Sequence, residues 1–156
     1  MKAPASITIM PAGMDHIATI AARMREEDRI EVMASSGSTP HYALMFSLEH
    51  SDMAFTGMID GQPEVMFGVC TLNVLTARGA PWLLGTDAVV THQRQFLRRS
   101  LWWKEKLFER YEVLTNFVHD DNAASKRWLK WLGFTLHPPV IMGKSGEAFR
   151  LFELRR

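Results

Sequence analysis

The spacing of hydrophobic residues changes along this chain, and that change is the strongest constraint on its fold. Before residue 50 the apolar side chains recur every three to four positions, as from Ile17 to Met24, which predicts amphipathic helices. The runs 53–59 and 64–75 are instead typical of strands, and Asp60-Gly61 between them is typical of a type I′ hairpin turn. A short strand rich in Ile and Thr at 6–10 is expected first, then the helices, followed by a β-meander.

The second half of the chain alternates strands with single helices. A turn at 79–81 is expected to lead into the third meander strand. The elements expected after it are a strand at 82–86, a helix at 91–110, a strand at 112–118, a helix from 121 or 122 to 132, and a hairpin at 134–154 that turns at 143–146. Strands separated by one helix are usually parallel neighbours, so the order predicts an α/β fold with a mixed sheet and helices on both faces.

Length and composition fit one domain over residues 1–156. The chain is 47% hydrophobic and 22% charged, and its net charge of +1 argues for neither nucleic acid nor an anionic membrane as a partner. Its single cysteine, Cys70, excludes an internal disulfide and a cysteine-based metal cluster. No targeting segment or membrane span is expected, and we predict a soluble protein of the cytoplasm.

One C-terminal segment carries a family resemblance. Asn122-Ala-Ala-Ser-Lys-Arg-Trp-Leu-Lys-Trp-Leu-Gly-Phe134 combines an Asn N-cap, a helix and a terminating glycine before an aromatic residue. With the order of elements, it resembles the GCN5-related N-acetyltransferase (GNAT) superfamily. The resemblance implies a mostly antiparallel central sheet of six to seven strands with helices on both faces. It also implies acetyl transfer from acetyl-CoA to a small-molecule or protein amine, with no metal.

Shorter stretches resemble small GNAT-like proteins of tailed bacteriophages, some of which are internal virion proteins. Among them are Asp28-Arg-Ile-Glu31, Phe67-Gly-Val69 and Ala80-Pro-Trp-Leu-Leu-Gly-Thr86. This resemblance implies a phage or prophage origin and an alternative function. The chain would then be a catalytically inactive protein of GNAT fold with a structural or virion-assembly role, phage structural proteins as partners, and a place in the virion or in the bacterial host's cytoplasm.

Two positions depart from the GNAT pattern. The family's central helix starts with Arg/Gln-x-x-Gly-x-Gly/Ala, whose glycines let backbone N–H groups approach the pyrophosphate of acyl-CoA. The corresponding stretch here, Thr91 to Arg99, contains no glycine. The family also often has a tyrosine seven residues after the Asn, as a general acid, and Leu129 occupies that position.

The glycine-free stretch is rich in cations. Between Thr91 and Arg110 there are six Lys or Arg and two Glu, a local net charge of +4. We interpret it as an anion site for acetyl-CoA, in which arginine side chains replace backbone contacts. A solvated helix face is the alternative, and a nucleic-acid surface is a weaker one because aromatic interleaving is absent. The candidate cofactor-binding residues are Thr91, Gln93, Arg94, Arg98 and Asn122.

Two residues are candidates for proton transfer. Asp87 follows the third meander strand and could deprotonate an amine if burial raised its pKa; a turn or cap role is the alternative. His119 ends a strand near the same site and is a candidate acid or base. The three residues after it, Asp120 to Asn122, are interpreted as helix caps rather than metal ligands.

Overall fold

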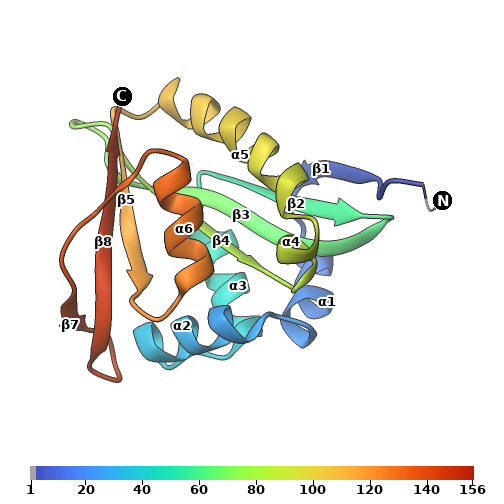
Figure 1. Ribbon diagram of the computed structural model, residues 1–156, viewed down its shortest axis with the longest axis horizontal. Coiled ribbons are helices and arrows are strands. Elements are labelled where there is room, and N and C mark those ends of the chain that lie inside the picture. Colours follow the sequence, from blue (N-terminus) through green and yellow to red (C-terminus); the bar gives the residue numbers. More distant parts are fainter. Residues whose placement is uncertain (1–2) are drawn as a thin grey trace.

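The computed structural model describes residues 3–156, and one twisted sheet of eight strands runs through the molecule (Figure 1). The strand order is β1-β2-β3-β4-β5-β8-β6, with β7 paired to β8. The strands are β1 (Ile7–Pro11), β2 (Met53–Ile59), β3 (Gln62–Asn73), β4 (Arg78–Gly85), β5 (Val113–His119), β6 (Thr135–Leu136), β7 (Val140–Met142) and β8 (Glu147–Arg155). The helices are η1 (Met14–His16), α1 (Ile17–Ala22), α2 (Glu26–Ser36), α3 (Pro40–His50), α4 (Ala88–Thr91), α5 (Gln93–Phe108) and α6 (Ala123–Trp131).

The sheet is antiparallel except where β4 meets β5. The mixed α/β class and the parallel pair across the central helical segment are therefore confirmed. The sheet has eight strands rather than six to seven, partly because segment 134–142 forms β6 and β7 instead of one strand. Pro138 and Pro139 separate these two strands, and proline lacks the N–H that a sheet ladder requires.

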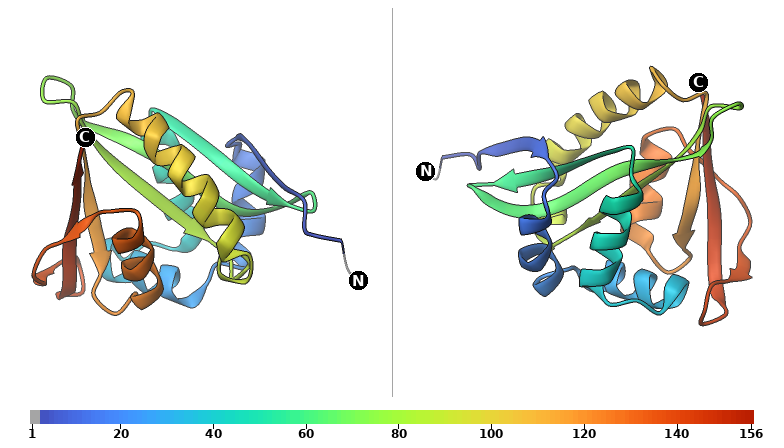
Figure 2. Two further views of the ribbon diagram at one scale, coloured as in Figure 1. Left: turned by 45° about the horizontal axis from the view of Figure 1, so that its top comes forward. Right: turned by 180° about the vertical axis from the view of Figure 1, so that it is seen from behind.

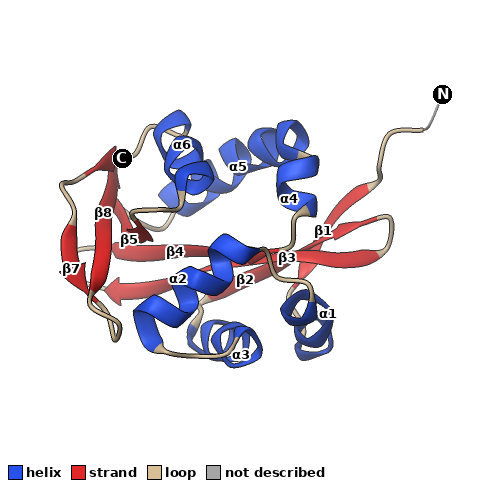
Figure 3. Cartoon of the chain, turned by 60° about the horizontal axis from the view of Figure 1, so that its bottom comes forward, coloured by secondary structure: helices blue, strands red, loops and turns tan. Residues whose placement is uncertain are grey.

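Helices cover both faces of the sheet. In Figure 3, α4, α5 and α6 lie above the strands, and α1, α2 and α3 lie below them. On the α1–α3 face the core is built around Ile17, Ile20, Leu44 and Met66. On the other face α5 and α6 pack over two hydrophobic clusters. The first contains Val69, Leu107, Leu114 and Phe152, and the second contains Val65, Val89 and Phe96. In the right-hand view of Figure 2, from behind, α3 lies in front of the central strands and α2 lies below them.

Local signals in the sequence position the first elements well. Asp60 and Gly61 both have positive φ, of 49° and 81°, which confirms the type I′ turn. The hydroxyl of Thr39 accepts a hydrogen bond from Tyr42 N–H at 3.2 Å and caps α3, whose first residue is a proline. Such signals depend on neighbouring residues alone, so they can be recognised before the tertiary structure is known.

Two predicted boundaries are wrong. The turn expected at 79–81 lies at 74–77, and 79–81 belong to β4. Pro81 is tolerated there because it pairs with Val69 at a position where β4 does not hydrogen-bond to β3. The helical segment expected from Thr91 begins at Ala88 and is interrupted at His92, so Thr91 ends α4 instead of opening the long helix.

The two adjacent tryptophans of α5 point into different surroundings, because neighbours on a helix are about 100° apart. Trp103 packs edge-on against Phe55 and Phe67, with ring centroids 5.3 and 5.2 Å away, while Trp102 is half exposed.

Within residues 3–156, every helix is too short or too polar to cross a lipid bilayer.

Candidate functional site

β4 and β5 diverge after a short parallel contact, and this opening forms the candidate site. The two strands pair only through Arg78 with Val113 and Gly79 with Leu114. Beyond that point a cavity of about 510 Å³ lies between the strands. Its walls come from α2 and α3 on one face of the sheet and from α5 and α6 on the other. The cavity therefore connects the two faces through the sheet.

Within residues 3–156, one backbone position of β4 faces the opening without a strand partner. Thr86 N–H donates to the Glu64 carbonyl of β3 at 2.9 Å, so the residues that bond to β3 are Thr86, Leu84 and Trp82 in alternation. The N–H and C=O groups of Leu83 consequently point away from β3 and toward β5. Leu83 also lines the cavity. Its N–H is a donor on a free strand edge, at the centre of the opening.

Two side chains and one backbone N–H satisfy the β4 edge on either side of Leu83. Nearer the contact with β5, Asn116 Nδ2 donates to the Pro81 carbonyl at 2.9 Å. At the far end, Asp28 accepts from Gly85 N–H at 3.0 Å, and Arg25 N–H donates to the Gly85 carbonyl at 2.9 Å. The unpaired stretch of edge is thus confined to Leu83.

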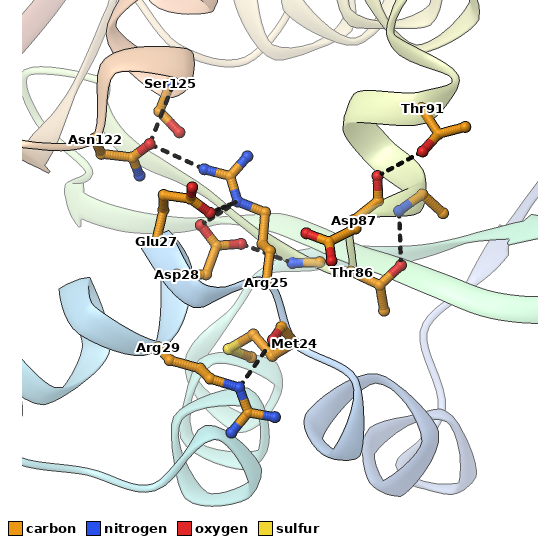
Figure 4. A network of polar contacts seen from close by, with 12 residues as sticks. Met24, Arg25, Glu27, Asp28, Arg29, Thr86, Asp87, Thr91, Asn122 and Ser125 are labelled. Carbon is orange, nitrogen blue, oxygen red and sulfur yellow. Dashed lines mark hydrogen bonds and ion pairs between the residues drawn. The ribbon is translucent and has the colours of Figure 1, made fainter.

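A buried ion pair closes the far end of the opening (Figure 4). Arg25 Nε lies 3.2 Å from Asp28 Oδ1, and its Nη2 donates to Asn122 Oδ1 at 2.9 Å. Asn122 also accepts from Ser125 N–H at 3.3 Å, which confirms its N-cap role on α6. The sequence resemblance pointed to Asn122, but its contact with Arg25 joins residues 97 positions apart and carries no local signal.

The carboxyl groups of α2 have perturbed acidities. Burial raises the pKa of Asp28 to about 7, against the opposing effects of Arg25 and of the Gly85 N–H. Burial also raises the pKa of Glu31, although the His119 N–H donates to its Oε1 at 2.5 Å and stabilises the charge. Glu31 lines the cavity. It is a carboxyl group at the site that the sequence analysis did not identify.

A smaller cavity of about 220 Å³ lies between the α4–α5 segment and α6. Its polar lining comes from Gln93, Arg127 and Arg25, and its apolar lining includes Val89 and Trp128. Trp128 lines the larger cavity too, so the two spaces are neighbours. Two cations beside an apolar floor make this space suited to an anionic group attached to a longer ligand.

Two of the five predicted cofactor-binding residues, Gln93 and Asn122, are associated with this smaller cavity. Gln93 lines it, and Asn122 holds Arg25, which also lines it. Thr91, Arg94 and Arg98 are exposed and lie outside both linings, and the Thr91 hydroxyl donates to the Asp87 carbonyl. The sequence analysis did not identify Arg25 or Arg127. Arg127 lies five residues after the cap Asn122. This spacing is the one local feature of the sequence that relates Arg127 to the smaller cavity.

The two predicted proton-transfer residues lie outside the cavity lining. Asp87 is exposed at the start of α4. His119 is buried, and both of its ring nitrogens are engaged: Nδ1 accepts from Asp121 N–H at 3.2 Å, so Nε2 carries the proton donated to Glu147 at 2.9 Å. Leu129, at the position of the family's tyrosine, does line the cavity. No cluster of metal-ligating side chains occurs between residues 3 and 156.

Comparison with known proteins identifies the fold. No protein-family model matches the chain, and no curated protein matches it in sequence. Solved structures do match. One described as an acetyltransferase has a TM-score of 0.73 and 13% identity, covering 96% of this chain and 85% of its own.

Two further matches are informative. A Salmonella typhimurium protein solved with its cofactor acetyl-CoA has a TM-score of 0.62 and 16% identity, covering 96% of this chain and 93% of its own. An acetyltransferase of the GNAT family from Streptococcus pneumoniae has a TM-score of 0.62 and 10% identity, covering 97% of this chain and all of its own. The chain therefore has the fold of GNAT acetyltransferases over nearly its whole length.

Proposed function

We propose that this protein is an N-acetyltransferase that uses acetyl-CoA and acts on an amine. The observation that carries the proposal is the opening between β4 and β5, with a cavity through the sheet and the unpaired Leu83 edge inside it. The peptide-like arm of acetyl-CoA has amide groups that can pair with such an edge. A structure with this fold has been solved with acetyl-CoA, which supports the same ligand here.

The chemistry needs little more than positioning. Acetyl-CoA supplies the thioester, and the Leu83 N–H is placed to stabilise negative charge on its carbonyl oxygen. A substrate amine that enters from the α2–α3 face lies opposite the coenzyme, and proximity accounts for much of the rate enhancement. Attack forms the C–N bond and breaks the C–S bond, and the thiolate leaves. Leu129 has no proton to give, so the thiolate takes one from the nitrogen of the adduct or from water.

The phosphates are assigned to the N-terminal half of the α4–α5 segment. Gln93, with Arg127 and Arg25 across the smaller cavity, forms the inner part of this anion site. Thr91, Arg94 and Arg98 would contribute from the exposed face of the same segment. Side-chain cations replace the backbone contacts that a glycine loop would make.

Isothermal titration with acetyl-CoA tests this proposal. We expect one molecule bound per chain, with an affinity that falls as salt is raised. Arg127→Ala and Arg98→Ala should each weaken binding by about tenfold, the effect of losing one charge-assisted contact. Lys106→Ala removes a cation at the other end of α5 and should leave the affinity unchanged. The absence of binding at millimolar acetyl-CoA would overturn the proposal.

A structural role without catalysis is the alternative, in line with the resemblance to phage proteins. The glycine-free stretch Thr91 to Arg99 is the observation that favours it. Phage structural proteins as partners, and a virion or cytoplasmic location, stay predictions. The same titration separates the two functions, because a chain that has lost the chemistry has no need to retain acetyl-CoA.

A further inference from the structure

The cavity has an aromatic wall on the face opposite the proposed coenzyme. Trp82 of β4 and Phe117 of β5 line it, together with Tyr42 and Phe46 of α3. The rings of Tyr42 and Phe46 stack with centroids 6.2 Å apart, and both are half exposed. Trp82 is fixed by a hydrogen bond from its Nε1 to Ser51 Oγ at 2.7 Å. This wall can bury an apolar body and remains open to the solvent.

The charged groups of the cavity are separated between the two faces. Within the described residues 3–156, its lining includes one acid, Glu31 of α2, and one base, Lys104 of α5. Lys104 donates to the Leu132 carbonyl at 2.9 Å and belongs to the coenzyme face. Lys144 lies beside Gly37 at the end of α2 but outside the lining. The aromatic face therefore presents a single carboxylate.

Glu31 is the acidic group that this face of the cavity offers to a ligand. The hydroxyls of Ser35 and Ser36 donate to the Val32 carbonyl of their own helix. Glu31 Oε1 accepts the His119 N–H, and the Asn122 side chain also hydrogen-bonds to the carboxylate. A carboxylate offers about four acceptor positions, so Glu31 can still accept from a ligand. An ammonium group next to the aromatic wall would find its counter-ion here.

We propose that Glu31 binds the amino group of the acceptor and takes its proton, and that the acceptor is a primary amine on an aromatic or large apolar body, with no carboxylate beside the nitrogen. This inference rests on the proposed acetyltransferase function and extends it to the substrate. A neutral or cationic amine complements the single acid. An α-amino acid would bring a second carboxylate against Glu31 on a face whose described lining offers it no cation.

In the proposed reaction Glu31 carries out one step, the deprotonation of the acceptor ammonium group. The ammonium form R–NH₃⁺ gives one proton to the Glu31 carboxylate and becomes the nucleophile R–NH₂. The nitrogen then forms the amide bond as the C–S bond breaks, and its second proton neutralises the departing thiolate; Glu31 returns its proton to water. Around Glu31 lie Arg25 and Asp28 on its own segment, and His119 of β5 with Glu147 behind it. A pKa raised by burial suits a group that must hold a proton near neutral pH.

Three amines of one skeleton test the substrate class. We measure kcat/KM at saturating acetyl-CoA for 2-phenylethylamine, L-phenylalaninamide and L-phenylalanine. The first should exceed the amino acid by about 100-fold, because like charges placed together are strongly disfavoured. The amide should recover most of that difference, since it keeps the skeleton but loses the charge. Equal rates for the amide and the acid, or turnover of none of the three by a protein that binds acetyl-CoA, would overturn the inference and leave the proposed function standing.

Glu31→Gln tests the residue. Glutamine keeps an oxygen for the His119 N–H, so the end of β5 stays attached while the charge is lost. We expect kcat/KM for 2-phenylethylamine to fall by about 100-fold, as for loss of a general base, with the acetyl-CoA affinity unchanged. Glu26→Gln, an exposed residue at the start of the same helix, is the control and should match wild type. Unchanged kcat/KM in Glu31→Gln contradicts the assignment, and a loss of acetyl-CoA binding would show that Glu31 serves the fold instead.

Discussion

At the scale of single residues, the main feature of the site is the buried ion pair between Arg25 and Asp28. Arg25 and Asp28 are both almost fully buried, and they connect the end of β4 with the start of α6. In the sequence they belong to a charged run, 25–29, of the kind found on solvated helix faces. Nothing local distinguishes them from the exposed Glu26 and Glu27, so their burial could not have been predicted. The packing of α2 across the strand ends decides it.

The raised pKa of Asp28 predicts a stability that depends on pH. The pKa is about 7 in the folded protein against an ordinary value of 3.8, so the folded state binds more protons than the unfolded state between these values. The contribution of Asp28 to the free energy of unfolding should therefore be largest below about pH 4 and should fall as the pH rises toward 7. Glu31, whose pKa is also raised, acts in the same direction.

Chemical denaturation of wild type and Asp28→Asn between pH 4 and 8 measures this effect. The neutral side chain can still accept the Gly85 N–H but does not titrate. We expect the free energy of unfolding of the variant, relative to wild type, to increase with pH by at most about 1.4 kcal/mol per unit. Parallel pH curves for the two proteins would show that Asp28 ionises normally.

At the scale of elements, the Asn122 cap and the Asp60-Gly61 turn were predicted correctly, whereas the turn expected at 79–81 was wrong. Thr39, Asn122 and Asp60-Gly61 act on their immediate neighbours, so their effect is visible in the sequence. The placement of 79–81 was wrong because glycine and proline are typical of turns. Whether β4 tolerates Pro81 depends on which residues bond to β3, and that register is fixed by the partner strand.

The two N-cap residues, Thr39 and Asn122, are expected to contribute differently to the free energy of unfolding. Thr39→Ala removes one exposed cap and should lower the free energy of unfolding by about 1 kcal/mol. Asn122→Ala removes a cap and also the partner of a buried guanidinium, so the loss should be about 2–4 kcal/mol. Urea denaturation of both variants at pH 7 compares them. Equal losses would mean that the bond between Asn122 and Arg25 contributes nothing.

At the scale of the whole molecule, the site results from two strands that separate. The order of elements and the segment 122–134 were enough to predict the fold, and Gln93 and Asn122 were placed near the proposed anion site. Leu83, Glu31 and Arg127 were not identified, because their roles depend on a cavity that exists only once β4 and β5 diverge and helices cover both faces. An unpaired N–H on a strand has no signature in the side-chain sequence.

Hydrogen exchange of individual backbone amides, with and without saturating acetyl-CoA, tests the use of this opening most directly. The Leu83 N–H has no strand partner and should exchange rapidly in the free protein; with acetyl-CoA bound we expect it to slow by at least tenfold. The neighbouring Leu84 N–H already bonds to β3 and should change little. An unchanged Leu83 rate under conditions where acetyl-CoA is bound would mean that the ligand lies elsewhere, and would contradict the assignment of the opening as the acetyl-transfer site.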